Sequence, residues 1–160
     1  MKKNQLDSVG YQAMLASTTK LNRIGPELAD LEAVHAVTDV TGFGLLGHLL
    51  EMCRGAGLAA DLDARAVPTL PGAAQLAQAG FGTGAATRNW ASYGPDVRLP
   101  DGVPDWGRGL LCDPQTSGGL LVAVRPDRAD DIVARCHAGG FTQAAIIGAF
   151  TDGAGVTVRG

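Results

Sequence analysis

The spacing of apolar and polar positions along the chain predicts helices that alternate with short strands. In the first thirty residues one set of side chains recurs every three or four positions, which predicts a leading helix that ends at Gly25-Pro26. The residues that share this face are Tyr11, Met14, Leu15, Thr18 and Leu21.

The segments that follow keep this alternation. The run VHAVTDV at 34–40 is short and rich in β-branched residues, which predicts a buried strand. Residues 45–54 form a helical pattern with leucines on one face and glycines directly after it. The run LAADLD at 58–63 is a weaker strand pattern, and Pro71 and Gly80 enclose a short predicted helix.

Periodicity is lost between residues 81 and 108. The stretch is rich in glycine and proline and holds both tryptophans of the chain, Trp90 and Trp106. It predicts a long Gly/Pro-rich loop with, at most, a short helix near 87–93. Loops of this length are uncommon in compact domains and are often functional.

Regular structure returns toward the carboxyl end. The pattern predicts a buried strand at 120–124, an amphipathic helix at 125–138, and two strands at 144–150 and 156–158 joined as a hairpin by an Asp-Gly turn. The order of elements predicts an α/β fold (layered α+β) in which a mixed β-sheet is covered by helices. No second domain boundary is evident, so residues 1–160 are expected to form a single domain.

The composition fits a globular domain and narrows its partners. Of 160 residues, 46% are hydrophobic and 18% charged, which allows one sizeable core. A net charge of -3 and an isoelectric point of about 5.5 argue against nucleic acid or an anionic membrane as partner. No run approaches the ~20 apolar residues of a membrane span, so a cytoplasmic protein is expected. Three widely spaced cysteines argue against a disulfide framework and a structural zinc site.

The segment TDVTGFG, from Thr38 to Gly44, is the first candidate site. Asp39 ends the predicted strand, where a carboxylate can bind a hard cation such as Mg²⁺. Gly42 and Gly44 would let the backbone approach a ligand closely. Each has a structural alternative, because aspartate often caps turns and tight turns select glycine. His48, in the helix that follows, is expected to be a hydrogen-bonded structural residue.

The segment CDPQTSGG is the second candidate. Its residues Thr116, Ser117, Gly118 and Gly119 could present hydroxyl and backbone N–H groups to an anion. A capped loop that enters a strand is the structural alternative. Cys112 is expected to be a buried packing residue, because the surrounding sequence supplies no base that would form a thiolate.

Two long stretches, HAVTDVTGFGLLGHLLEM and LLCDPQTSGGLLVAV, resemble the two signature segments of the C-terminal domain of the selenophosphate synthetase (selenide, water dikinase) family. This family belongs to the aminoimidazole ribonucleotide synthetase superfamily. The segments TTKLNRIGPEL and AAIIGAF are also similar to that domain, so the resemblance covers nearly the whole chain. It implies the layered α/β fold of the superfamily's C-terminal domain.

The resemblance also implies chemistry and cofactors. Members of the family use ATP and Mg²⁺ to convert selenide and water into selenophosphate, AMP and phosphate. Asp39 then corresponds to a magnesium-binding aspartate that acts with aspartates of another domain. Gly42 and Gly44 would allow the chain to pass close to the phosphates, and residues 116–119 are expected to join the same cofactor-binding site.

In this family a glycine-rich segment with a reactive cysteine or selenocysteine and a lysine precedes an N-terminal ATP-binding domain. No such segment occurs before Met1, so the resemblance predicts a C-terminal domain that needs this partner and is inactive alone. The alternative is a free-standing anion-binding, metal-binding or interaction module without catalysis. Apolar surface at the partner interface also predicts a homo-oligomer.

Overall fold

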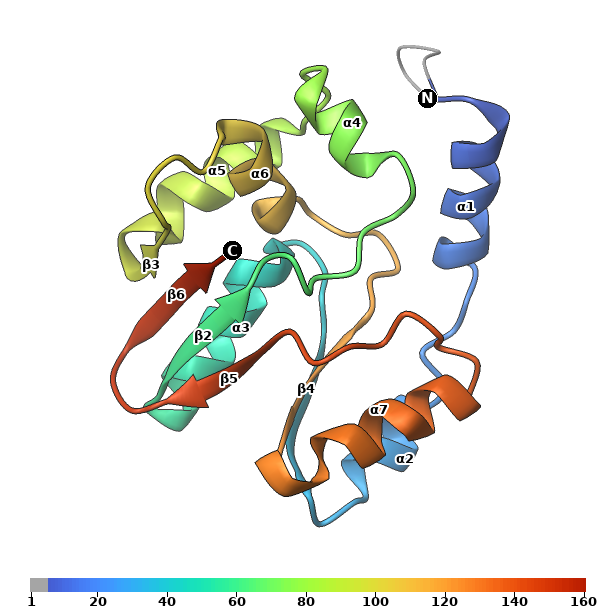
Figure 1. Ribbon diagram of the computed structural model, residues 1–160, viewed down its shortest axis with the longest axis vertical. Coiled ribbons are helices and arrows are strands. Elements are labelled where there is room, and N and C mark those ends of the chain that lie inside the picture. Colours follow the sequence, from blue (N-terminus) through green and yellow to red (C-terminus); the bar gives the residue numbers. More distant parts are fainter. Residues whose placement is uncertain (1–5) are drawn as a thin grey trace.

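The two strands that adjoin the candidate motifs pair with each other. A computed structural model describes residues 6–160 (Figure 1). Strands β1 (Val34–Asp39) and β4 (Leu120–Val124), both predicted from the sequence, form an antiparallel pair. Asp39 is opposite Leu120 in this register. The end of β1 therefore lies beside the start of β4, and the segments that follow β1 and precede β4 meet at the same end of the pair.

Four further strands form a mixed sheet in the order β3-β6-β2-β5. They are β2 (Ala59–Asp63), β3 (Val97–Arg98), β5 (Gly148–Thr151) and β6 (Gly155–Arg159). Strand β2 pairs parallel with β6 and antiparallel with β5, and β3 is parallel to β6. The predicted class, with a mixed sheet and helices, is confirmed. The expectation of one sheet is corrected, because the described residues form two.

Strands β5 and β6 do not form the predicted hairpin. They lie on opposite sides of β2, and the turn between them passes around Ala59, which pairs with both Thr151 and Gly155. In this turn Gly153 has a φ of 119°, a conformation that favours glycine. The Asp-Gly pattern correctly marks a turn. It fails to predict the strand order, because the strand that separates the two arms comes from a distant part of the sequence.

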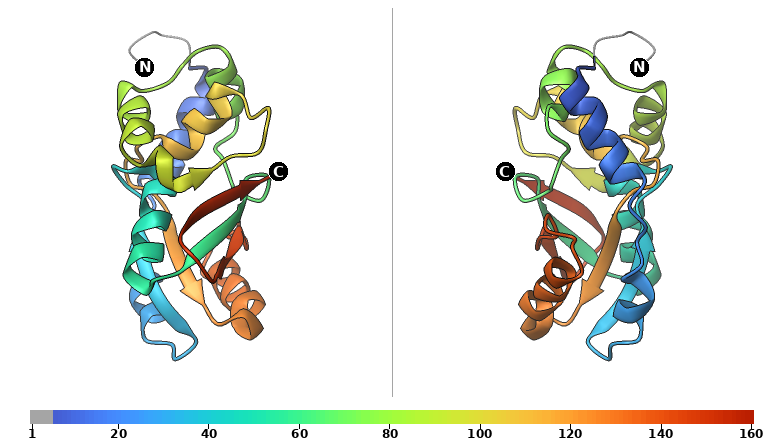
Figure 2. Two further views of the ribbon diagram at one scale, coloured as in Figure 1. Left: turned by 90° about the vertical axis from the view of Figure 1, so that its left-hand side faces the viewer. Right: turned by 90° about the vertical axis from the view of Figure 1, so that its right-hand side faces the viewer.

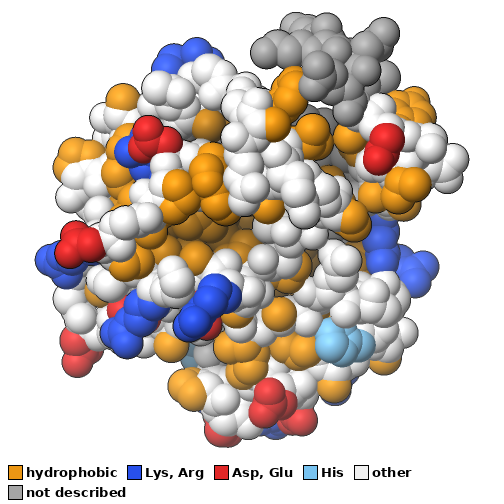
Figure 3. Space-filling model, turned by 45° about the horizontal axis from the view of Figure 1, so that its top comes forward, with side chains coloured by type: hydrophobic (Ala, Val, Ile, Leu, Met, Phe, Trp, Pro, Cys, Tyr) orange, Lys and Arg blue, Asp and Glu red, His pale blue; other side chains and the backbone are white. Residues whose placement is uncertain are grey.

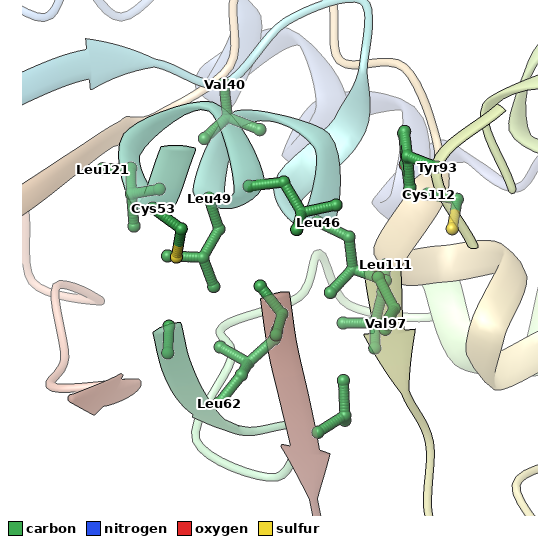
Figure 4. Close-up of a cluster of buried hydrophobic side chains, with 14 of the residues drawn as sticks. Val40, Leu46, Leu49, Cys53, Leu62, Tyr93, Val97, Leu111, Cys112 and Leu121 are labelled. Atoms are coloured by element: carbon green, nitrogen blue, oxygen red, sulfur yellow. The ribbon is translucent and has the colours of Figure 1, made fainter. Parts of the chain in front are cut away.

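Helix α3 (Gly44–Ala56) packs against the four-stranded sheet and forms the main core. The predicted apolar face is confirmed: Leu46, Leu49 and Cys53 are buried, and they approach Leu62 of β2 (Figure 4). The helix ends at Gly57, whose φ of 68° gives the left-handed cap that glycine favours.

A second apolar cluster lies on the β1–β4 pair. Helices α2 (Gly25–Ala29) and α7 (Ala129–Ala138) flank these strands (Figures 1 and 2). The buried side chains of this cluster are Ile24, Leu28 and Ile132. A single turn of 3₁₀ helix, η2 (Pro126–Arg128), precedes α7, so the predicted helix at 125–138 starts a few residues later than expected.

The leading segment contains two helices where the sequence predicted one. Helix α1 (Ser8–Thr18) begins after Asp7, whose side chain accepts a hydrogen bond from the Gly10 backbone at 2.7 Å. Gly25 and Pro26 begin α2. The prediction that they end the leading helix is wrong. Proline is favoured in the first turn because the N–H that it lacks has no partner there. The part of the predicted helix at residues 1–5 lies outside the described residues.

The long loop predicted at 81–108 is largely ordered into regular elements. After the predicted helix α4 (Ala73–Gln78) the chain forms α5, a 3₁₀ turn η1, β3 and α6. Their bounds are Gly84–Tyr93 for α5, Gly94–Asp96 for η1 and Asp105–Cys112 for α6. The predicted short helix near 87–93 is confirmed as part of α5. The rest of the loop prediction is wrong, because glycine and proline occur here mostly at the ends of short elements.

The helices in the described range are all short. The longest, α3, has 13 residues. Within residues 6–160 no helix combines the length and the apolar character that crossing a bilayer requires.

Candidate functional site

The two candidate motifs lie side by side at one end of the β1–β4 pair. The Val40 backbone N–H donates to the Gly119 carbonyl at 2.9 Å, which extends the strand pairing by one bond. The Gln115 backbone N–H donates to the Thr41 carbonyl at 3.0 Å. The loop after Asp39 and the loop before β4 are therefore joined through their backbones. We call these two segments, 40–44 and 113–119, the motif loops.

Two of the four candidate glycines are explained by packing between the motif loops. Gly44 has a φ of 67°, and a Cβ there would lie 2.6 Å from the Cys112 carbonyl carbon. A Cβ at Gly118 would overlap the carbonyl oxygen of Val40. Both positions need glycine because one backbone touches the other, whether or not a ligand binds.

The other two candidate glycines have no such explanation. A Cβ at Gly42 or at Gly119 would meet no heavy atom within 4 Å, and neither residue has a positive φ. Both are exposed. The open space beside them could admit a ligand or another domain close to the backbone.

Thr116 and Ser117, in the same loop as Gly119, are also exposed. Neither hydroxyl has a hydrogen-bond partner among residues 6–160. Ser117 has a φ of 52°, a left-handed conformation that costs on the order of 1 kcal/mol for a residue with a side chain. The loop thus presents two hydroxyl groups that have no partner among the described residues, and hydroxyl groups can donate hydrogen bonds to an anion.

Asp39 is exposed at the end of β1. Its carboxylate makes no hydrogen bond or ion pair with any described residue, so it does not act as the turn cap that was its structural alternative. A free carboxylate suits a hard cation, but Mg²⁺ is normally held by more than one ligand. Within residues 6–160 no three His, Cys, Asp or Glu side chains converge on a point that could hold a metal ion.

Helix α5 contacts both motif loops, a role that the sequence pattern does not predict. Asn89 donates from Nδ2 to the carbonyls of Gly42 and Cys112, each at 3.0 Å. The Tyr93 hydroxyl donates to the Phe43 carbonyl at 2.7 Å. A sequence signal for the helix was available: Thr83 is a typical N-cap, and its Oγ1 accepts a bond from the helix backbone. The side-chain contacts had no comparable signal, because their partners are distant in sequence.

Two titratable side chains beside the motif loops, Cys112 and Tyr93, are buried in the main core. Burial raises the pKa of the Cys112 thiol, and its hydrogen bond with Tyr93 lowers it less. Burial likewise raises the pKa of the Tyr93 hydroxyl. Figure 4 shows these two side chains together at one end of the main core. The expectation that Cys112 is a packing residue agrees with its complete burial.

His48 lies behind the first loop in α3 and is also buried. Its Nε2 is 3.3 Å from the Thr41 hydroxyl, and its Nδ1 is 3.2 Å from a Glu51 carboxylate oxygen. The second contact has the distance of an ion pair but not the geometry of a hydrogen bond. His48 therefore braces the loop from within the helix, as a structural histidine would.

This fold and these loops define a class of protein. The family model for the C-terminal domain of AIR synthase related proteins matches residues 2–160, and the chain belongs to that family. Within it, the chain is 58% identical over 153 residues to a selenide, water dikinase of Burkholderia ambifaria and 54% identical over 154 residues to that of Rhizobium meliloti. Each alignment covers 96% of this chain. The chain spans 43% and 44% of the length of these two relatives.

Solved structures support the fold. A crystal structure of E. coli HypE matches 99% of this chain and 40% of the HypE chain with a TM-score of 0.63, at 19% identity. A second crystal structure of E. coli HypE, a hydrogenase maturation protein, matches 84% of this chain and 35% of the HypE chain with a TM-score of 0.55, at 20% identity. At this level of identity the similarity shows a shared fold and carries no argument about activity.

Proposed function

We propose that this chain is the C-terminal domain of a selenide, water dikinase. In that reaction ATP gives one phosphoryl group to selenide and one to water, which yields selenophosphate, AMP and phosphate. The curated relatives carry this name at more than 50% identity across nearly the whole of this chain. The chain matches less than half of their length, so the complete activity is assigned to a larger protein that contains this domain.

The proposal rests on the surface where the two motif loops meet, at one end of the β1–β4 pair. It presents the Asp39 carboxylate and the Thr116 and Ser117 hydroxyls, which have no partner among residues 6–160, and open space at Gly42 and Gly119. An oxygen ligand for Mg²⁺ beside groups that can donate to phosphate oxygens is what ATP chemistry requires.

Each group has a distinct proposed task. The Asp39 carboxylate binds Mg²⁺ together with carboxylates of an N-terminal ATP-binding domain. A bound Mg²⁺ neutralises charge on the transferring phosphoryl group. The hydroxyls and backbone N–H groups of 116–119 orient phosphate oxygens, while Gly42 lets them approach the first loop.

The exposed apolar surface supports contact with that second domain or with another copy. Phe43, in the first motif loop, is 52% exposed, and Leu21 is 80% exposed. Figure 3 shows a hollow lined by hydrophobic side chains near the middle of one face. Apolar surface of this kind is usually covered in the working protein.

The proposal can be tested by restoring a second domain. The chain is joined to the amino-terminal portion of the Burkholderia ambifaria relative, and we call the product the two-domain protein. We expect it to form AMP and selenophosphate only when ATP, Mg²⁺ and selenide are all present, measured by phosphorus NMR. Selenide-independent ATP hydrolysis, or no turnover despite cooperative folding, would contradict the proposal and leave the non-catalytic binding module.

A further inference from the structure

Asn89 is the one described side chain that donates hydrogen bonds to the backbones on both sides of the motif junction. Its Nδ2 lies 3.0 Å from the Gly42 carbonyl oxygen in the first loop. The same nitrogen lies 3.0 Å from the Cys112 carbonyl oxygen, just before the second loop. The side chain is half-buried and comes from α5, which belongs to neither loop.

The chemistry of this contact selects an amide. Nδ2 carries two hydrogens, so it can donate to both carbonyl oxygens, one in the first motif loop and one at the last residue of α6, directly before the second motif loop. Carbonyl oxygens repel one another, so a group that donates to both fixes their separation. A carboxylate of the same shape would present only acceptors, and a hydroxyl would supply a single donor.

Helix α5 is itself anchored at both ends, so Asn89 is held in place. At its start the Thr83 hydroxyl caps the helix and donates to the Asp113 carboxylate at 2.8 Å. At its end the Tyr93 hydroxyl donates to the Phe43 carbonyl at 2.7 Å. The start of α5 thus contacts the second motif loop at Asp113, and its end contacts the first motif loop at Phe43. Asn89 lies between these two contacts along the helix.

We propose that Asn89 is a positioning residue that sets the distance between the two motif loops. The Gly42 and Cys112 carbonyl groups then keep a fixed separation, and Asp39 keeps a fixed place relative to the hydroxyls of Thr116 and Ser117. The effect on turnover rests on the proposed function, whereas the effect on loop spacing does not.

The first test measures amide hydrogen exchange in the 160-residue chain. The reporter is the Gln115 N–H, which donates to Thr41 across the junction, and the amides of β2 report global stability. In Asn89→Ala we expect Gln115 to exchange about tenfold faster while β2 stays unchanged. Asn89→Asp keeps the shape of the side chain and should have the same effect. It replaces Asn89→Ala in this test if the alanine variant folds poorly. Ser92→Ala, an exposed position of the same helix, is the matched control and should change neither.

An unchanged Gln115 in a folded variant would overturn the inference. So would acceleration of Gln115 and β2 by the same factor, because that would show only global destabilisation. The second test uses the two-domain protein, in which Asn89→Ala should raise the KM for Mg-ATP by about tenfold and leave the melting temperature close to that of Ser92→Ala. An unchanged KM would remove the role in the site. If the parent two-domain protein makes no AMP, the proposed function fails, and the exchange experiment still decides the role of Asn89.

Discussion

Gly118 and Val40 are packed so closely that a methyl group on Gly118 would overlap the Val40 carbonyl oxygen. The two residues belong to different motif loops, so this contact measures how tightly the loops join. The neighbouring Gly119 has no atom within 4 Å of the same hypothetical methyl group. Packing against Val40 therefore requires glycine at position 118, whereas no packing contact requires it at position 119.

We expect Gly118→Ala to lower the free energy of unfolding by about 3 kcal/mol, because the loops must separate to admit the methyl group. Gly119→Ala is the matched control and should remain within about 1 kcal/mol of the parent. Urea denaturation followed by circular dichroism measures both. Equal stability of the two variants would show that the loops separate readily.

Gly42→Ala separates a structural requirement from a ligand requirement. The structure has room for the methyl group, so stability should stay within about 1 kcal/mol of the parent. In the two-domain protein the same methyl group would occupy space that we assign to phosphates, and affinity for Mg-ATP should fall by about tenfold. Isothermal titration calorimetry measures this affinity. If both properties match the parent, Gly42 does not face the nucleotide.

Asp39→Asn tests the metal ligand directly. The amide preserves the size of the side chain, and no described contact to the carboxylate is lost, so folding should be unaffected. Nucleotide affinity of the two-domain protein in the presence of Mg²⁺ should fall at least about tenfold, because a negative ligand is replaced by a neutral one. Without Mg²⁺ the variant and the parent should bind nucleotide alike. Asp130→Asn, on the exposed surface of α7, serves as control.

Cys112 gives a prediction about alkaline pH. Burial raises the pKa of its thiol above the ordinary value of 9.0, so the folded chain keeps the proton while the unfolded chain loses it. The unfolded state then binds fewer protons, and the free energy of unfolding should fall as the pH rises above about 9.

Cys112→Ala should lose less stability than the parent between about pH 8 and pH 10, although it is less stable at neutral pH by about 1–2 kcal/mol. Denaturant melts at both pH values measure this difference. Turnover of the two-domain protein should stay within a few-fold, because the thiol is buried and not activated. Loss of turnover in a variant that melts like the parent would instead make Cys112 a catalytic residue.

The sequence predicted elements whose determinants are local. The leucine face of α3 and its glycine cap, and the apolar run of β4, all lie within the elements that they specify. Helix α5 was only partly predicted, because glycine and proline dominate the surrounding composition. Its N-cap Thr83 and the spacing of Ala86, Trp90 and Tyr93 would have predicted its full extent.

The arrangement of the site depends on contacts between distant segments. The two motifs are recognisable in the sequence. Their contact in space depends on the pairing of Asp39 with Leu120, which the sequence does not predict. Asn89 contacts residues 47 and 23 positions away, and no local pattern marks an asparagine that will donate to two distant carbonyls. The distinction between packed and open glycines likewise required the structure. The family resemblance identifies the two motif segments. The structure shows which of their residues are packed against the other segment and which are exposed.

The last prediction concerns the 160-residue chain by itself. It should fold cooperatively, because it contains two apolar clusters built from segments throughout the described chain. It should bind Mg-ATP weakly and form no AMP with selenide, since Asp39 is a single free carboxylate and no three metal-ligating side chains converge within residues 6–160.

The exposed apolar residues also predict self-association of the isolated chain, because such surface is usually covered by a partner. Light scattering should therefore give the mass of a dimer or a larger assembly. An AMP-formation assay with ATP, selenide and Mg²⁺ is run on the same sample, beside Asp39→Asn. AMP above background that Asp39→Asn abolishes would show that this domain carries a complete active site, and it would contradict the assignment of the remaining metal ligands to a second domain.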